Sequence, residues 1–313
     1  MHPRHKRNHE ITHELRDLES GSALKVTARS TGRSVIATIG IDRYRHWPGL
    51  ANAVQDARGV SRLFQQLGFE QVAEPLLDGG ATGNAIQSLV TDELRALGSE
   101  DSLVLFYGGH GGTRKHHLGD QMIKTGYLIP VDASASPDKV ASWIDLEAWL
   151  RTVSLLPAKH ILVILDACHS GVALDPILKW RDVGSWQDAS PSALNARRSR
   201  RIITSALDDQ MACDSGPVAG HSLFTGCLIE GLTHGLRRRG HHATTGSELG
   251  LYVQRRVATY PDSRQTPDFG TFEFDDRGEI LIPLLNGRRR SPAGSAKAED
   301  RVRRRAPTKL ASW

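Results

Sequence analysis

A cysteine and a histidine, each placed among small residues directly after an apolar run, are the side chains of this sequence best suited to catalysis. The run Ser102–Tyr107 continues into Gly-Gly-His-Gly-Gly, centred on His110, and the run His160–Leu165 continues into Asp-Ala-Cys-His-Ser-Gly, which contains Cys168. A thiol attacks a carbonyl group as its thiolate, which a neighbouring imidazole generates before it protonates the leaving amine. Free N–H groups after a strand can bind the developing oxyanion. The two motifs together indicate acyl transfer through a nucleophilic cysteine.

Each motif alone has a simpler interpretation. A buried cysteine is most often a small apolar side chain, and a glycine-rich turn after a strand can hold a phosphate group. The phosphate interpretation is disfavoured because no Gly-Lys-Ser/Thr follows His110 and residues 113–119 lack a helical pattern. Both motifs at strand ends are much more specific than either alone.

The elements that must position these motifs alternate between strands and helices. Apolar and β-branched runs predict strands over 34–41, 72–77, 102–107, 127–131, 160–165, 201–206 and 279–283, and apolar periodicity predicts helices over 52–67, 82–97, 145–153, 222–234 and 247–259. Uniformly apolar strands between helices indicate an α/β fold with a central, mostly parallel sheet flanked by helices on both faces. Because ligands bind beyond the carboxyl ends of such strands, His110 and Cys168 face one crevice if their strands are neighbours.

Charge divides the chain into three parts, although the net charge is only +5. Residues 288–313 carry nine Lys or Arg against two acids, and residues 1–33 carry seven against four, which leaves the middle acidic. We therefore expect a polar basic N-terminal segment over 1–33, a catalytic domain over 34–286 and a basic disordered tail over 287–313. Such a tail could contact nucleic acid, although a solvated tail is the simpler interpretation. Within the domain, the polar stretch 176–200 is expected to be a flexible linker.

Few features point outside the cytoplasm. No apolar run is long enough to cross a bilayer, and the charged first residues do not form a secretory signal. Three cysteines, two of them taken as structural, are too few for a disulfide framework. We expect a cytoplasmic protein.

The sequence resembles the caspase-like cysteine peptidases, and among them the metacaspases and their bacterial relatives. The resemblance covers about residues 34–285 and is carried by Gly-Gly-His-Gly at 108–111, Asp-Ala-Cys-His-Ser-Gly at 166–171, their spacing and the order of elements. It departs from true caspases, in which a Gln stands where this chain has Asp166. The resemblance implies a caspase-like α/β fold, Cys168 as nucleophile, His110 as acid–base partner, and the N–H groups of Gly111 and Cys168 as the oxyanion hole.

The resemblance also implies a specificity. Metacaspases cleave after Arg or Lys, which an acidic S1 pocket binds, and a carboxylate can pair with a guanidinium bidentately. Asp166 lies two residues before the cysteine and so shares its face in an extended strand. Asp56 matches an S1 residue of the family, and Asp208 matches a loop beside that pocket. Each aspartate alone could equally be a helix cap or a surface charge.

Self-processing and calcium are two further expectations from the resemblance. Relatives carry a cleavable linker, and the candidate cleavage sites here are Arg197, Arg198, Arg200 and Arg201; a solvated charged loop is the alternative. Many metacaspases need Ca²⁺, which carboxylate oxygens bind, and the candidate ligands are Asp175 and Asp145. No other cofactor is expected.

The function expected from the sequence is therefore regulated proteolysis by a self-processing cysteine endopeptidase, with proteins or peptides carrying a basic P1 residue as substrates. A competing class remains open: an inactive caspase-like scaffold, or a binding module that contacts nucleic acid through its tail. Cleavage of peptides with different P1 residues separates these classes.

Overall fold

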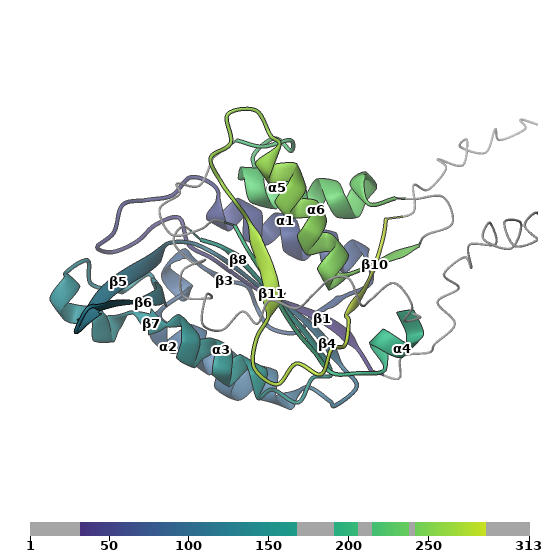
Figure 1. Ribbon diagram of the computed structural model, residues 1–313, viewed down its shortest axis with the longest axis horizontal. Coiled ribbons are helices and arrows are strands. Elements are labelled where there is room, and N and C mark those ends of the chain that lie inside the picture. The colour runs from purple at the N-terminus through teal and green to yellow at the C-terminus, as the bar shows by residue number, and fades with distance from the viewer. Residues whose placement is uncertain (1–31, 168–190, 206–214, 238–241, 286–313) are drawn as a thin grey trace, which may run out of the picture.

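A mostly parallel β-sheet forms the centre of the molecule, as Figure 1 shows for the computed structural model, which describes residues 32–167, 191–205, 215–237 and 242–285. The strand order is β11-β9-β8-β4-β1-β2, with β3 also paired to β1. The parallel strands are β1 (Ser34–Gly40), β4 (Ser102–Gly108), β8 (His160–Asp166), β9 (Ser199–Thr204), β2 (Glu70–Gln71) and β3 (Leu76–Leu77), and β11 (Asp268–Thr271) runs antiparallel to β9. The predicted α/β class is confirmed.

The central strands bury both of their faces because apolar residues occupy successive positions. Along β4, Leu103 and Leu105 point into one core, while Val104 and Phe106 point into the other. Helices α2 (Gly83–Ser88) and α3 (Leu146–Ser154) cover the first face, and α1 (Ala53–Gln66), α5 (Leu223–Glu230) and α6 (Gly246–Ala258) cover the second (Figure 1). The prediction of helices on both faces is therefore confirmed.

Several helices begin at residues that accept a hydrogen bond from the first turn. Thr82, Asp145 and Ser222 cap α2, α3 and α5 in this way, and Thr245 forms a capping box with Glu248 at α6. The helix predicted over 82–97 is shorter than expected, since α2 passes into a π-helical turn at Leu89–Glu93 and a 3₁₀ turn at Leu94–Ala96. No helix in the described part of the chain is long and apolar enough to span a bilayer.

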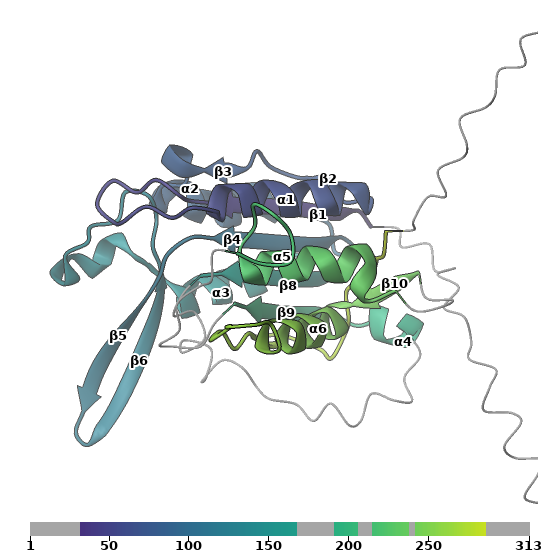
Figure 2. The ribbon, with the colours of Figure 1, turned by 90° about the horizontal axis from the view of Figure 1, so that it is seen from above.

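A hairpin that the sequence pattern did not predict follows the first motif. Strands β5 (Gly111–Leu118) and β6 (Gln121–Leu128) pair along their whole length, and β7 (Ile144–Asp145) pairs with β6. The hairpin projects from the body of the molecule, as Figure 2 shows, and its far half is exposed. Strands without a buried face need no apolar alternation, so the sequence pattern of this region predicts a strand over 127–131 alone. A separate pair joins β10 (Ala243–Thr245) to β12 (Leu281–Pro283).

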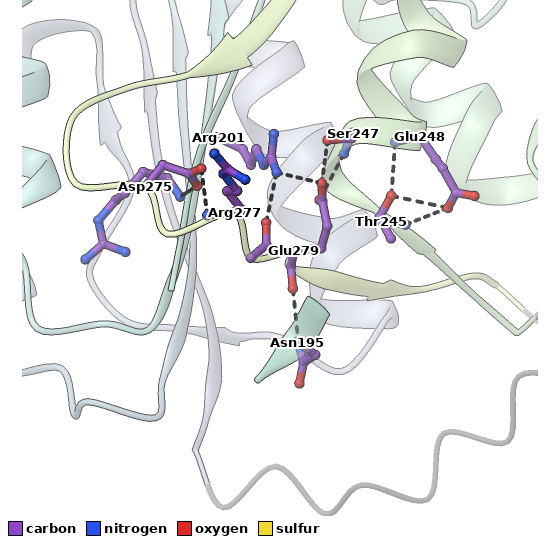
Figure 3. Close-up of polar contacts among 10 residues, drawn as sticks. Asn195, Arg201, Thr245, Ser247, Glu248, Asp275, Arg277 and Glu279 are labelled. Atoms are coloured by element: carbon purple, nitrogen blue, oxygen red, sulfur yellow. Dashed lines mark hydrogen bonds and ion pairs between the residues drawn. The ribbon is translucent and has the colours of Figure 1, made fainter. Parts of the chain in front are cut away.

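The end of the predicted flexible linker is built into the fold. Helix α4 (Pro191–Asn195) leads into β9, and the Asn195 carbonyl accepts a hydrogen bond from His160 Nε2 at 2.9 Å. Figure 3 shows Asn195 beside Glu279, whose carboxylate pairs with Arg201 at 2.9 Å and accepts a hydrogen bond from Ser247. The expected linker is therefore ordered over 191–200, while residues 176–190 lie outside the described part.

Two of the four predicted cleavage sites, Arg200 and Arg201, are buried in the sheet. Both lie in β9, between β8 and β11, and their exposed fractions are only 1% and 8%. The Arg200 guanidinium donates hydrogen bonds to the carbonyl groups of Ser154, Leu156, Lys159 and Ser199. Burial lowers the pKa of Arg200 to about 10. A protease could reach these peptide bonds only after β9 had left the sheet.

Candidate active site

The two sequence motifs begin at one edge of the central sheet. Strands β4 and β8 are adjacent and parallel, with Gly108 opposite Asp166, and the Gly109 N–H donates a hydrogen bond to the Asp166 carbonyl at 3.1 Å. The condition set by the sequence, that the two strands be neighbours, is therefore met. His110 lies two residues beyond the paired Gly108. Cys168 lies outside the described residues, which end at Ala167 on this strand.

The imidazole of His110 is oriented by a backbone carbonyl. His110 Nε2 lies 2.8 Å from the carbonyl oxygen of Pro48, in the loop after β1. Because a carbonyl oxygen only accepts hydrogen bonds, Nε2 must carry the proton, and Nδ1 is then the nitrogen able to take up a further proton. The ring also packs against Tyr44 and Trp47, with centroid separations of 4.8 and 5.8 Å.

The backbone around His110 is held by two tyrosines. The Tyr44 hydroxyl accepts a hydrogen bond from the His110 N–H at 2.7 Å, and the Tyr107 hydroxyl donates to the His110 carbonyl at 3.0 Å. Residue 109 must be glycine, because a Cβ atom there would come within 3 Å of both tyrosine oxygens. The glycine-rich motif thus serves close packing. Gly111, the expected oxyanion residue, is buried at the start of β5.

The predicted S1 residues Asp56 and Asp166 meet at the N-terminal end of α5. The Asp56 carboxylate lies 2.6 Å from His221 Nδ1 and accepts from the Ser222 N–H at 3.3 Å. The Asp166 carboxylate accepts from the hydroxyls of Ser222 and Thr225 at 2.6 and 2.7 Å. Residues from α1, β8 and the start of α5 therefore form one buried polar cluster.

Asp166 ionises with difficulty in this cluster. Burial, and secondarily the nearby charge of Asp56, raise the pKa of Asp166 to about 6, while the hydroxyls around it act in the opposite direction. A carboxyl with such a pKa is ionised at neutral pH but protonated in mild acid. Perturbed carboxyls of this kind are concentrated at functional sites.

Sequence reasoning missed the groups that orient these side chains. Pro48 and the aromatic residues beside it follow β1, whose carboxyl end lies at the same sheet edge as those of β4 and β8. A loop at that edge was the available signal. His221 and Ser222 offered only a helix-capping serine, since nothing local reveals that they contact a carboxylate 165 residues away.

Of the remaining predicted site residues, one caps a helix and the others lie outside the described part of the chain. Asp145 caps α3 by accepting a hydrogen bond from the Ala148 N–H at 3.0 Å. Asp175 and Asp208 lie in undescribed segments, so their predicted roles stay untested. Within the described residues, no three His, Cys, Asp or Glu side chains are grouped so that they could hold a metal ion. Cys227 is buried, which raises the pKa of its thiol to about 12 and makes it a poor nucleophile.

The two exposed arginines among the predicted cleavage sites lie far from His110. Arg197 and Arg198 precede β9 at the end of the sheet where β8 begins, because His160 is paired with Ser199. His110 lies at the opposite end, beyond Gly108. A strand of seven residues such as β8 is ~20 Å long, so the length of the sheet separates these arginines from His110.

Comparison with known proteins gives a consistent result. A model of the caspase domain matches residues 33–274. Metacaspase-1A of Neurospora crassa is 28% identical over 194 residues, which are 55% of this chain and 41% of that protein. Metacaspase-2 of Arabidopsis thaliana is 30% identical over 167 residues, which are 48% of this chain and 37% of that protein. The chain thus matches about two fifths of the length of these relatives.

A solved structure supports the fold. A crystal structure of a Geobacter sulfurreducens protein superposes with a TM-score of 0.51 at 18% identity, covering 82% of this chain and 95% of the other. At this level of identity the likeness bears on the fold alone.

Proposed function

The chain belongs to the caspase-domain family, and from this premise we propose that it is a cysteine endopeptidase in which Cys168 is the nucleophile and His110 its acid–base partner. The observation that carries the proposal is the setting of His110. Its ring follows β4, next to the strand that leads to the cysteine, and a carbonyl oxygen 2.8 Å from Nε2 fixes its tautomer.

The proposed chemistry uses the two imidazole nitrogens differently. Nδ1 of His110 takes the proton from the Cys168 thiol, and the thiolate attacks the substrate carbonyl to form a tetrahedral oxyanion. The N–H groups of Gly111 and Cys168 donate hydrogen bonds to that oxyanion. The Nδ1 proton then passes to the leaving amine, and water hydrolyses the thioester with the same nitrogen as base. Pro48 stabilises the imidazolium through its carbonyl dipole.

We further propose cleavage after Arg or Lys. Support comes from the buried carboxylates of Asp56 and Asp166, which both accept hydrogen bonds from Ser222 at the end of the strand that leads to the nucleophile. A guanidinium or ammonium group entering a buried acidic pocket gains a charge-assisted hydrogen bond that a neutral side chain cannot form. Asp208 remains a predicted contributor to the same pocket.

Self-processing, if it uses the exposed Arg197–Arg198 pair, is proposed to occur between molecules. The pair lies at the end of the sheet opposite His110, and its backbone is tied to the loop before β12, since the Arg198 carbonyl accepts hydrogen bonds from the N–H groups of Asp276 and Gly278. Reaching its own dyad would require the chain to give up these contacts and cross the length of the sheet. Cleavage by a second molecule requires only that the segment around Arg197 and Arg198 be released locally.

A panel of fluorogenic peptides tests the proposed function. Peptides with Arg, Lys, Asp, Asn or Gln at P1 are incubated with the full chain, with and without Ca²⁺, and cleavage of the Arg and Lys peptides alone is expected. Cys168→Ala and His110→Ala should abolish cleavage, while His116→Ala, which changes an exposed histidine of the neighbouring hairpin, should leave it unchanged. Undiminished cleavage by Cys168→Ala would overturn the mechanism, and cleavage after Asp alone would overturn the specificity.

A further inference from the structure

A histidine outside both sequence motifs completes the acidic cluster. His221 Nδ1 lies 2.6 Å from Asp56 Oδ1, and the exposed fractions of the two side chains are 8% and 2%. Because Asp56 Oδ1 also accepts a hydrogen bond from the Ser222 N–H, this oxygen acts as an acceptor and His221 Nδ1 donates to it.

The fold makes room for this imidazole at the expense of helix α1. Gly59 lies in the interior of α1, where glycine costs about 1 kcal/mol relative to alanine. A Cβ atom at position 59 would overlap the His221 ring. The ring therefore lies directly on the helix backbone, one turn from Asp56. The methyl group of an alanine at position 59 would occupy the space that the ring fills.

The ionisable groups around the cluster come from three elements. Asp56 belongs to α1, Asp166 ends β8, and His221 precedes α5. Asp42, in the loop after β1, is a further neighbouring charge that Asp56 affects, and it accepts a hydrogen bond from the Val54 N–H. Among the described residues, His221 is the group of this cluster that can carry a positive charge.

Charge balance decides what such a cluster can bind. Two ionised carboxylates side by side in a buried site are unfavourable, and one of them tends to keep its proton. A buried site is stable only when its charges are paired. An imidazolium at His221 would cancel the charge of Asp56. Because Asp42 is only half-buried, Asp166 would then hold the one buried negative charge left to receive an incoming cation.

We propose that His221 is a specificity-determining residue that positions and neutralises Asp56, so that Asp166 alone receives the cationic side chain of the substrate. The proposal rests on the proposed peptidase function and deepens it by assigning the charge of the S1 pocket. His221 acts through Asp56 and does not itself contact the reacting atoms. Without His221, Asp56 and Asp166 compete for one proton. As the pH falls, the pocket then loses its preference for a cation at a higher pH than the wild-type pocket does.

The test compares two substrates of nearly equal shape. The ratio of kcat/KM for a peptide with Arg at P1 to that for its citrulline analogue reports the charge of the pocket, because the dyad acts equally on both. In the wild-type chain this ratio should rise as the pH rises through about 6, where Asp166 ionises. In His221→Gln the pH at which the ratio rises should increase by about one unit or more. The uncompensated charge of Asp56 raises the pKa of Asp166, and a neighbouring charge shifts a pKa by about 1–3 units. The ratio at pH 6.5 should then fall about threefold or more, because the ionised fraction of Asp166 at that pH drops from about three quarters to about one quarter or less.

A second substitution separates charge from structure. The double variant His221→Gln/Asp56→Asn no longer carries the unpaired charge. The ratio should then rise at the same pH as in the wild-type chain. A merely structural role for His221 predicts that the double variant is at least as impaired as the single one. An unchanged ratio in His221→Gln, or no recovery in the double variant, overturns the proposal.

A measurement without catalysis keeps this inference distinct from the proposed function. In the Cys168→Ala chain labelled with ¹⁵N-histidine, the His221 ring should give the spectrum of an imidazolium at pH 7 and that of a neutral ring in Cys168→Ala/Asp56→Asn. A neutral His221 ring with Asp56 present overturns the inference even if peptides are cleaved. Absence of cleavage of every peptide, with an imidazolium at His221, refutes the peptidase and leaves the charge assignment standing.

Discussion

Replacing Asp166 with asparagine should stabilise the fold at neutral pH while removing the preference for basic substrates. The carboxyl is buried, and its pKa is raised from 3.8 to about 6. The folded chain therefore holds this proton more tightly than the unfolded chain does. The stabilising contribution of the protonated group is fully present below about pH 4 and is lost as the pH rises through about 6.

The magnitude follows from the two pKa values. A difference of about two units corresponds to ~3 kcal/mol of stability lost between pH 4 and neutral pH. Asparagine keeps a carbonyl oxygen that can accept from Ser222 and Thr225 but carries no charge to bury. The Asn variant should therefore exceed the wild type in unfolding free energy by up to ~3 kcal/mol at pH 7 and by little at pH 4.

Urea unfolding of Cys168→Ala chains at several pH values between 4 and 8 measures this difference. Asp120→Asn, an equivalent change at an exposed position of the hairpin turn, serves as the matched control and should shift stability little at any pH. Equal differences between Asp166→Asn and its parent at pH 4 and pH 7 would refute the reasoning, because they would point to packing or hydrogen bonding instead of ionisation.

Three other predictions concern the dyad, the linker and the core. Gly109→Ala should lower kcat for Arg peptides at least tenfold, because the new Cβ displaces the tyrosine hydroxyls that hold the next residue. Circular dichroism should show that the fold persists, and an unchanged kcat would contradict this prediction. Chains carrying Cys168→Ala should stay intact alone and be cut at Arg197–Arg198 only when active chain is added, at a rate proportional to its concentration; concentration-independent cutting of active chain would indicate an intramolecular route. Arg200→Met should cost about 1–3 kcal/mol in urea unfolding because it leaves buried carbonyl groups without their donor, and a loss below about 0.5 kcal/mol would show that water replaces the guanidinium.

The central sheet could be predicted because its signal is local. Strands buried on both faces require runs of apolar residues such as those of β1, β4 and β8, and these are visible without any knowledge of the partner strands. The projecting hairpin was missed for the opposite reason. Its far half faces water on both sides, so its sequence carries no alternation to detect.

The local sequence pattern does not predict the burial of charged residues whose partners come from distant parts of the chain. The basic run that ends in Arg200 and Arg201 indicates a solvated loop in sequence terms. In the structure, the Arg200 guanidinium donates to carbonyl groups around the end of α3 and at the start of β8 and β9, and Arg201 forms an ion pair with Glu279, which lies 78 positions later in the chain. Such partners are brought together only when the layers assemble.

The sequence by itself determined the order of the apolar central strands and of the main helices, and the position of each motif at a strand end, because these follow from periodicity over short distances. Only the tertiary structure decided what surrounds the candidate residues. Pro48 reaches His110 across 62 positions, and His221 reaches Asp56 across 165. Hydrogen bonds and charges act over a few ångströms in space whatever the separation along the chain, so the tautomer of one histidine and the acidity of Asp166 are properties of the fold.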